Sequence, residues 1–113
     1  MDCIFCKIIN GDIPSDKIYE DDKVLAFHDI SKEAPVHFLV IPKEHICSIN
    51  EINEKNSDII SHIFLIINKI VKELSISETG YRIINNCGKD GGQTVNHIHF
   101  HVMGQRELKW PPG

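Results

Sequence analysis

Three histidines recur at every second position near the end of the chain, in the segment Asn96–Met103. Successive side chains of a β-strand point to opposite faces, so this spacing places the three imidazoles on one face and the apolar residues between them on the other. We therefore predict a strand over this segment whose apolar residues enter a core and whose imidazoles are aligned over whatever lies opposite. The histidines are His97, His99 and His101, and the alternating apolar residues are Ile98, Phe100 and Val102.

The size and charge of the chain exclude several classes of protein. Its 113 residues suit one domain, residues 1–113, with a single core. A net charge of −4 without a basic stripe argues against a nucleic-acid or membrane-surface partner. The start lacks the basic and apolar parts of a secretory signal, and the longest apolar run, Ile63–Ile67, is too short to span a bilayer. We expect a cytoplasmic protein, with the nucleus as an alternative location.

Hydrophobic periodicity predicts an α+β fold, an antiparallel sheet of about five strands with one long helix and one short N-terminal helix. The long helix has an apolar stripe at spacings of three and four, formed by Ile60, Ile63, Phe64, Ile67, Val71 and Leu74, while Leu65 falls on its polar side. The expected elements are a short helix over 3–10, a hairpin of 17–19 and 24–28, a strand over 37–41, the long helix over 57–75, and a strand over 81–86 before the histidine strand.

The four cysteines leave the use of one pair open. Without a secretory signal, Cys3, Cys6, Cys47 and Cys87 are expected to be reduced thiols. Cys3 and Cys6 form a Cys-x-x-Cys pair, which is compatible with a metal site, a redox pair or chance. The pair becomes informative only if two further ligands join it.

A glycine-rich loop leads directly into the histidine segment. Gly88, Gly91 and Gly92 can turn consecutive backbone N–H groups towards one anion, although such glycines also serve plain turns. Gln93 and Thr94 add hydrogen-bond donors. An anion held there would lie against the imidazoles.

The histidine row is compatible with three kinds of function. A neutral imidazole is a nucleophile near pH 7, and attack on phosphorus would give a covalent phosphorus–nitrogen intermediate. Alternatively, three histidines could hold a catalytic metal that activates water. The third possibility is a nucleotide-binding or scaffold module without catalysis.

Several motifs together resemble the histidine-triad superfamily, and within it the histidine-triad nucleotide-binding protein (Hint) branch. The resemblance covers nearly the whole chain, and the terminal Trp-Pro-Pro-Gly is its most selective part. The matching segments are 2–9, 25–30, 37–43, 91–95 and 110–113, together with the His-x-His-x-His motif itself.

The resemblance implies a purine nucleoside phosphoramidase that cleaves the P–N bond of adenosine 5′-phosphoramidates and also acts on related aminoacyl adenylates, with AMP or GMP derivatives as substrates. His99 would be the nucleophile, His101 would contact the phosphate and assist departure, and His37 would support the triad. Asp29 would accept the ribose hydroxyls. The base would lie among Phe5, Phe27, His28, Ile30 and Leu39, and the phosphate would lie near Asn86, Gly92, Gln93 and Thr94.

The resemblance also implies a structural zinc and a homodimer. The zinc ligands would be Cys3, Cys6, His45 and His97, and catalysis would need no cofactor. In the homodimer the two sheets would be continuous, and the C-terminal tail with Trp110 would reach the partner's site and influence which amines fit.

Overall fold

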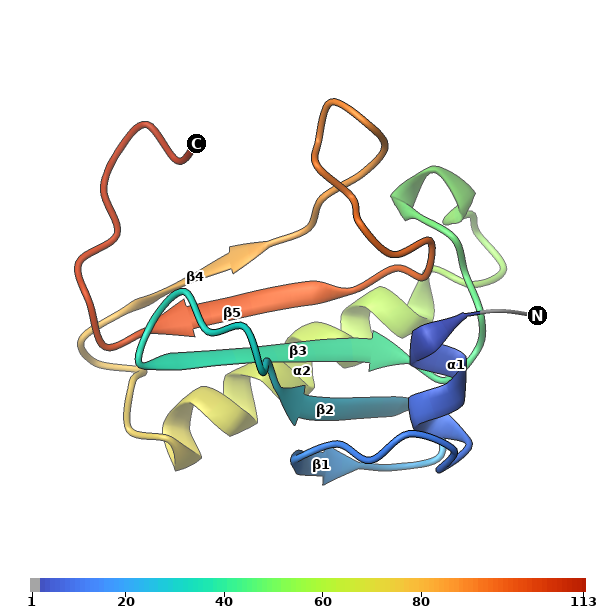
Figure 1. The fold of residues 1–113 in the computed structure, drawn as a ribbon, viewed down its shortest axis with the longest axis horizontal. Coiled ribbons are helices and arrows are strands. Elements are labelled where there is room, and N and C mark those ends of the chain that lie inside the picture. The colour runs from blue at the N-terminus through green and yellow to red at the C-terminus, as the bar shows by residue number, and fades with distance from the viewer. Residues whose placement is uncertain (1–2) are drawn as a thin grey trace.

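A five-stranded antiparallel sheet forms the centre of the molecule, in the order β1-β2-β3-β5-β4 (Figure 1). The structure is a computed structural model that describes residues 3–113, so Met1 and Asp2, used in the argument about a secretory signal, lie outside it. The predicted α+β fold is confirmed. The strands are β1 (Lys17–Glu20), β2 (Val24–His28), β3 (Val36–Pro42), β4 (Tyr81–Ile84) and β5 (Phe100–Gly104), and the helices are α1 (Ile4–Ile9), α2 (Asp58–Glu73) and a 3-10 turn, η1 (Ile49–Glu51).

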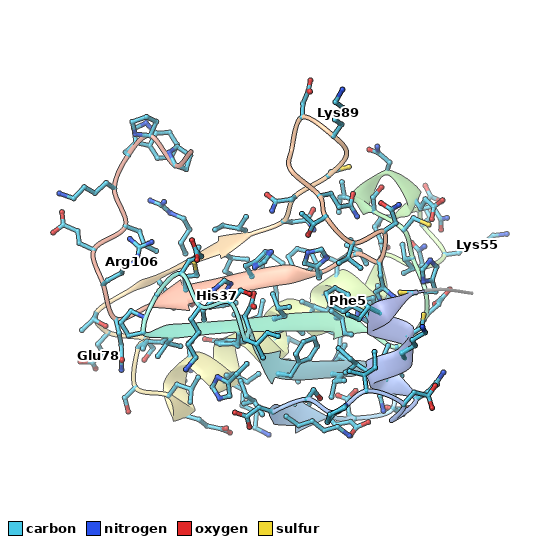
Figure 2. All side chains as sticks on the ribbon, in the orientation of Figure 1. Phe5, His37, Lys55, Glu78, Lys89 and Arg106 are labelled. Atoms are coloured by element: carbon cyan, nitrogen blue, oxygen red, sulfur yellow. The ribbon has the colours of Figure 1, made fainter. Side chains whose placement is uncertain are left out.

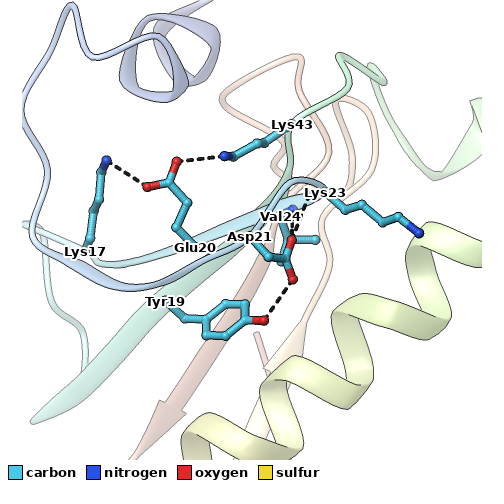
Figure 3. Close-up of polar contacts among 7 residues, drawn as sticks. All are labelled: Lys17, Tyr19, Glu20, Asp21, Lys23, Val24 and Lys43. Carbon is cyan, nitrogen blue, oxygen red and sulfur yellow. Dashed lines mark hydrogen bonds and ion pairs between the residues drawn. The ribbon is translucent and has the colours of Figure 1, made fainter.

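The turn between β1 and β2 is fixed by one aspartate. Asp21 Oδ1 accepts hydrogen bonds from the backbone N–H groups of Lys23 and Val24, both at 2.8 Å, and Oδ2 accepts one from the Tyr19 hydroxyl at 2.9 Å (Figure 3). His62 of α2 lies 2.7 Å from the same Oδ2. Burial works against the ionised carboxylate, but these hydrogen bonds outweigh it and hold the pKa of Asp21 well below its usual range. The turn and the long helix are thereby tied together.

The long helix α2 lies across one face of the sheet and covers the larger core (Figure 1). The predicted stripe is partly wrong, because Ile66 and Ile70 are buried whereas Phe64 is 46% exposed at its border and packs only edge-on against Phe100. Almost every residue on this side of the helix is apolar. The spacing of apolar residues was therefore compatible with two adjoining stripes, one that includes Phe64 and one that includes Ile66 and Ile70. The buried residues of α2 are Ile63, Ile66, Ile67, Ile70 and Val71.

The opposite face of the sheet is divided between an apolar end and a histidine end. α1 covers the apolar end through Phe5 and Ile8, which pack with Leu39 and Ile41 of β3. The predicted alternation along β3 is confirmed, because its intervening residues Phe38 and Val40 lie in the α2 core. Beyond the reach of α1, this face carries His37 and His101, and it therefore contains the candidate site.

The histidine strand is shorter than predicted. β5 begins at Phe100, so His97 and His99 precede it. The backbone here makes other hydrogen bonds: the Ile98 N–H donates to the Ile46 carbonyl at 2.7 Å, and the His97 carbonyl contacts the His99 ring at 2.8 Å. The alternation nevertheless survives, since Ile98, Phe100 and Val102 all enter the α2 core.

The end of one further strand differs from the prediction. β4 stops at Ile84 rather than residue 86. The C-terminal tail projects from the sheet as expected, with Trp110 82% exposed (Figure 1). Within residues 3–113, no helix combines the length and apolar character needed to cross a membrane.

Candidate active site

The strand register brings three histidine rings into one row. Leu39 of β3 lies opposite His101 of β5, so His37, two residues away on the same face, is the diagonal neighbour of His101. The ring centroids of His37 and His101 are 5.1 Å apart, as are those of His99 and His101. His97 does not join this row, since its ring packs against His45 at 4.9 Å.

His99 is held in the form that a nucleophile requires. Its Nδ1 lies 2.8 Å from the His97 carbonyl, and because a carbonyl only accepts, Nδ1 carries the proton. The lone pair is therefore on Nε2. The ring is only 3% exposed and packs edge-on against Phe5, with centroids 5.1 Å apart, while Asn85 Nδ2 donates to the His99 carbonyl at 3.0 Å. Packing and backbone contacts thus fix both the position and the tautomer.

His101 is held in the opposite form through His37. The backbone N–H of Glu33 donates to His37 Nδ1 at 3.1 Å, so a neutral His37 carries its proton on Nε2. That nitrogen lies 2.9 Å from His101 Nδ1, which must then accept, leaving the His101 proton on Nε2. Burial, with smaller contributions from His99 and His37 and against the opposing effect of Asp29, lowers the pKa of His101 to about 4. His101 is therefore a neutral N–H donor at pH 7.

Asp29 completes this end of the row. Its Oδ2 lies 3.4 Å from His37 Nε2 and 3.9 Å from His101 Nδ1, and its Oδ1 accepts from the Ser31 N–H at 2.8 Å. These three side chains are close enough to share a metal ion. A metal would need the lone pair of His37 Nε2, however, and that nitrogen carries a proton. Burial lowers the pKa of His37 despite the nearby carboxylates, so the group is better described as a hydrogen-bonded cluster.

A second cluster, around His97, is suited to a metal. His97 Nε2 donates to the Pro42 carbonyl at 2.8 Å, so the Nδ1 lone pair faces Cys3 Sγ at 3.3 Å and Cys6 Sγ at 3.6 Å. His45 Nδ1 lies 3.3 Å from Cys6 Sγ. Tetrahedral zinc with its usual bond lengths would separate sulfur and nitrogen ligands by about 3.5 Å. These four residues can hold a metal ion such as zinc.

Local chemistry supports metal binding at this second cluster. The Cys3 sulfur caps α1 by accepting from the Cys6 N–H at 3.3 Å, which turns both thiols to one side of the helix end. Burial and the neighbouring Cys3 raise the pKa of Cys6, and burial lowers that of His97. A bound cation would favour the Cys6 thiolate and so lower the pKa of that thiol. It also needs a neutral imidazole as a ligand, and the lowered pKa of His97 provides one.

The three motif histidines do not form one catalytic metal site among residues 3–113. His97 turns towards the cysteines, His99 towards a carbonyl and His101 towards His37. The three-histidine metal hypothesis is therefore wrong in its geometry.

The glycine loop is braced from within. A Cβ at Gly91 would meet the Cys87 carbonyl oxygen at 2.3 Å, and Gly92 has φ +76°, so both positions require glycine. The Gln93 amide donates to the carbonyls of Cys47 and Val95 and accepts from the Gly88 N–H. The side chain of Gln93 is therefore committed to the loop, and an anion would have to use other donors.

The other residues expected at a nucleotide site divide into buried and exposed groups. Phe5, Phe27 and Leu39 are buried together beside α1, with His28 and Asp29 partly exposed at the end of β2. Ile30 is 99% exposed and Trp110 82% exposed, so the described protomer does not bring them to the row. Asn86 is partly buried and Thr94 exposed on the two sides of the glycine loop.

Sequence reasoning missed three groups that hold the histidines: two that set the tautomer of a ring, and one that bonds to the backbone carbonyl of His99. They are the Pro42 carbonyl, the Glu33 N–H and the side chain of Asn85. Two of the three are backbone groups, which carry no side-chain signal. Asn85 stands in a predicted strand, where its neighbour Asn86 had drawn attention instead.

Comparison with known proteins agrees with this geometry. The family model described as "HIT domain" matches residues 10–108. An uncharacterized HIT-like protein of Synechococcus elongatus is 46% identical over 112 residues, covering 99% of this chain and 97% of that protein. A HIT family hydrolase from Legionella pneumophila superposes with a TM-score of 0.97 at 45% identity, covering 99% of this chain and 100% of that one. A histidine triad nucleotide-binding protein from Candida albicans gives a TM-score of 0.84 at 36% identity, covering 97% and 83%. The chain belongs to the HIT family.

Proposed function

We propose that this protein is a hydrolase of the nucleotide-binding branch of the family, a purine nucleoside phosphoramidase acting on adenosine 5′-phosphoramidates and related aminoacyl adenylates. The observation that carries the proposal is the hydrogen bond from His99 Nδ1 to the His97 carbonyl, which leaves Nε2 with its lone pair. The description of the Legionella relative as a hydrolase and of the Candida relative as nucleotide-binding supports the same class.

In the first step, His99 Nε2 attacks phosphorus. A phosphorus–nitrogen bond forms to the ring. In an aminoacyl adenylate the bond from phosphorus to the carboxyl oxygen breaks and a carboxylate leaves, whereas in a phosphoramidate the P–N bond breaks with its electron pair passing to the departing nitrogen. That nitrogen takes a proton from solvent before it leaves, so a neutral amine departs. The ring becomes a nucleotidyl-imidazolium, and its charge is stabilised by the Nδ1–H bond to the His97 carbonyl.

His101 assists this departure as a hydrogen-bond donor rather than as an acid. With a pKa of about 4 its ring is neutral at pH 7, and the proton on Nε2 can bond to a phosphoryl oxygen as charge develops. In the second step, water attacks phosphorus, the bond to His99 breaks with its electron pair returning to Nε2, and the water proton passes to solvent. The nucleoside monophosphate is then released.

Residues around the row would bind the nucleotide. The carboxylate of Asp29 would accept the ribose hydroxyls, for which its two oxygens are suited. Phe5, Phe27 and Leu39 would supply apolar surface to the base with His28 and Ile30 at its edge, while Asn86, Thr94 and the backbone of Gly92 and Gln93 would lie towards the phosphate. A purine ring then ends beside β2 and the phosphate beside the histidines.

We also propose that zinc occupies the cluster of Cys3, Cys6, His45 and His97. Two thiolates and two imidazoles would close a tetrahedral site with no open position, so the ion would be structural. It would fix His97, whose carbonyl orients the nucleophile, and would take no part in the reaction.

A homodimer is the assembly that best fits the exposed surface. A hollow of about 690 Å³ lies along α2 and η1, bordered by Phe64 and by Leu65, which is 67% exposed. β4 is an edge strand, which leaves backbone groups free for a second copy. Pairing of β4 with β4 of a second copy would make the two sheets continuous and let the tail with Trp110 reach the partner's site. Sedimentation of the wild type and of Leu65→Glu should give a dimer and a monomer, and a monomeric wild type would disprove this assembly.

The decisive experiment is replacement of the nucleophile. His99→Asn should reduce turnover of an adenosine 5′-phosphoramidate on the order of 10³-fold or more, because the amide of asparagine cannot replace the ring nitrogen that forms the covalent intermediate. His62→Asn, which alters a histidine on α2, is the matched control and should keep full activity. Acid-labile, base-stable nucleotidylation of the wild type should be visible by intact mass. Retained activity in His99→Asn would overturn the proposal, and purine binding without turnover by the wild type would favour a binding module.

A further inference from the structure

The segment after β5 returns to the loop that joins β2 to β3. There the Arg106 Nε donates a hydrogen bond to the Glu33 carbonyl at 2.8 Å, while its Nη1 donates to the Glu107 carbonyl at 3.3 Å. Figure 2 shows Arg106 at the start of the C-terminal segment, at the same end of the sheet as His37. The guanidinium therefore links two segments separated by 73 positions in the sequence.

The same residue, Glu33, also controls the histidine row through its other backbone group. Its N–H bonds to His37 Nδ1, and His37 in turn donates from Nε2 to His101 Nδ1. A short chain of hydrogen bonds, at 2.8, 3.1 and 2.9 Å, thus runs from Arg106 through Glu33 and His37 to His101.

We infer that Arg106 is a positioning residue for His101: by holding the Glu33 carbonyl, it keeps the neighbouring N–H on His37 and so keeps the His101 proton on Nε2. The inference rests on the proposed function, in which that proton faces the phosphoryl group. Arg106 itself does not touch the substrate.

The alternative tautomer shows why this matters. If the Glu33 N–H moved away, His37 could carry its proton on Nδ1, and Nε2 would then accept from His101 Nδ1. The lone pair of His101 would in that case lie on Nε2, facing the anionic oxygens of the substrate. His37 is only 3% exposed, so solvent offers little compensation for a lost partner. Asp29 Oδ2 lies nearer His37 Nε2, at 3.4 Å, than His101 Nδ1, at 3.9 Å, so it also favours the proton on His37 Nε2, and loss of the Glu33 contact alone should give a mixture of tautomers.

The test compares Arg106→Met with Lys109→Met. Both variants remove one positive charge from the same segment, but only the first removes the bond to Glu33. Arg106→Met should lower kcat about five-fold with little change in KM, as expected for one hydrogen bond that acts through another group. Arg106→Lys, which can still donate to the carbonyl, should recover part of this loss. Lys109→Met should match the wild type.

The tautomer itself can be observed without turnover. Two-bond proton–nitrogen NMR of the labelled full-length protein should show the His101 proton on Nε2 in the wild type and Lys109→Met, and a mixture of tautomers in Arg106→Met. An unchanged tautomer in Arg106→Met would overturn the inference, whatever the rate. If the wild type cleaves no phosphoramidate, the proposed function fails, but the NMR comparison still decides whether Arg106 sets the tautomer.

Discussion

Two polar clusters flank His99, and they use similar residues for different purposes. Towards α1, His97 meets His45 and two thiols, whereas at the start of β3, His101 meets His37 and Asp29. Each cluster contains one histidine of the motif, and each brings several possible metal ligands together. Distance alone does not separate them.

The difference lies in the backbone group that each cluster meets. In the first cluster, the Pro42 carbonyl accepts a hydrogen bond from His97 Nε2, so the lone pair on His97 Nδ1 points towards the thiols. An N–H, that of Glu33, donates to His37 and so places a proton between the two rings. The first arrangement presents lone pairs to a cation, and the second does not. The tautomer therefore distinguishes a metal site from a hydrogen-bonded cluster better than proximity does.

Chelation tests whether the first cluster, that of His97 and the two thiols, holds a metal, and it should have the largest effect on stability. Chelation at neutral pH should reduce the free energy of unfolding by several kcal/mol, on the order expected for a structural ion tied to thiolates. Cys3→Ser should be equally destabilised and insensitive to chelator, and Cys87→Ser should behave as the wild type. The measurements are thermal unfolding and metal content by mass spectrometry. Equal stability with and without chelator would remove the distinction drawn between the clusters.

Lowering the pH should reduce the stability of the protein through the second cluster, that of His101, His37 and Asp29. Because the pKa of His101 falls from about 6.5 when unfolded to about 4 when folded, the unfolded state binds the proton first as pH drops. The stability conferred by the neutral ring is full above pH 6.5 and is lost between pH 6.5 and 4, a change on the order of 3 kcal/mol. Denaturant unfolding of metal-free protein across this range should show the loss, and His101→Gln should flatten the curve. A wild-type curve as flat as that of His101→Gln would contradict the assignment.

Asn85 tests whether the nucleophile between the clusters needs its own support. Asn85→Ala removes the hydrogen bond to the His99 carbonyl and should cost about 1 kcal/mol of stability, with a several-fold loss of kcat. Asn50→Ala, on the exposed turn η1, is the control and should change neither. Unaltered kcat in Asn85→Ala would show that packing by Phe5 and the bond to the His97 carbonyl position the ring without Asn85.

Neutralising a charge in a surface cluster remote from both sites should have the smallest effect on stability. Glu20 bridges Lys17 at 3.0 Å and Lys43 at 2.7 Å (Figure 3), and the side chains of all three are partly exposed to solvent. The two lysines, Lys43 first, lower the pKa of Glu20. Glu20→Gln should cost about 0.5 kcal/mol or less, and high salt should erase the difference. A larger loss would mean that surface pairs contribute on the scale assigned here to Asn85.

Side-chain patterns predicted the architecture because alternate residues of a strand lie on opposite faces of the sheet and enter different surroundings. Ile98, Phe100 and Val102 entered the core as expected, even though the first of them lies outside β5. The start of β5 could not be predicted, since the ladder is replaced there by bonds to the Ile46 carbonyl and within the histidine segment. The choice of Phe64 over Ile70 for the stripe failed because two adjoining apolar stripes lie on the same side of α2.

The candidate site was only half visible in the sequence. Resemblance to the family named the rings and thiols that the structure brings together, but the roles of individual nitrogens depend on backbone groups from distant segments. No pattern in the chain indicates that Glu33 would donate to His37 or that Pro42 would accept from His97. Such information appears only when the loops are placed in space.

The contact between Cys3 and His97 joins residues 94 positions apart. During synthesis, the two thiols therefore leave the ribosome more than 90 residues before their partner His97. Because domains generally fold once their sequence is available, this corner is completed only after His97 has emerged. Until then, the nascent chain carries a dithiol without that partner, and this interval is the time at which oxidants or competing metals can divert it.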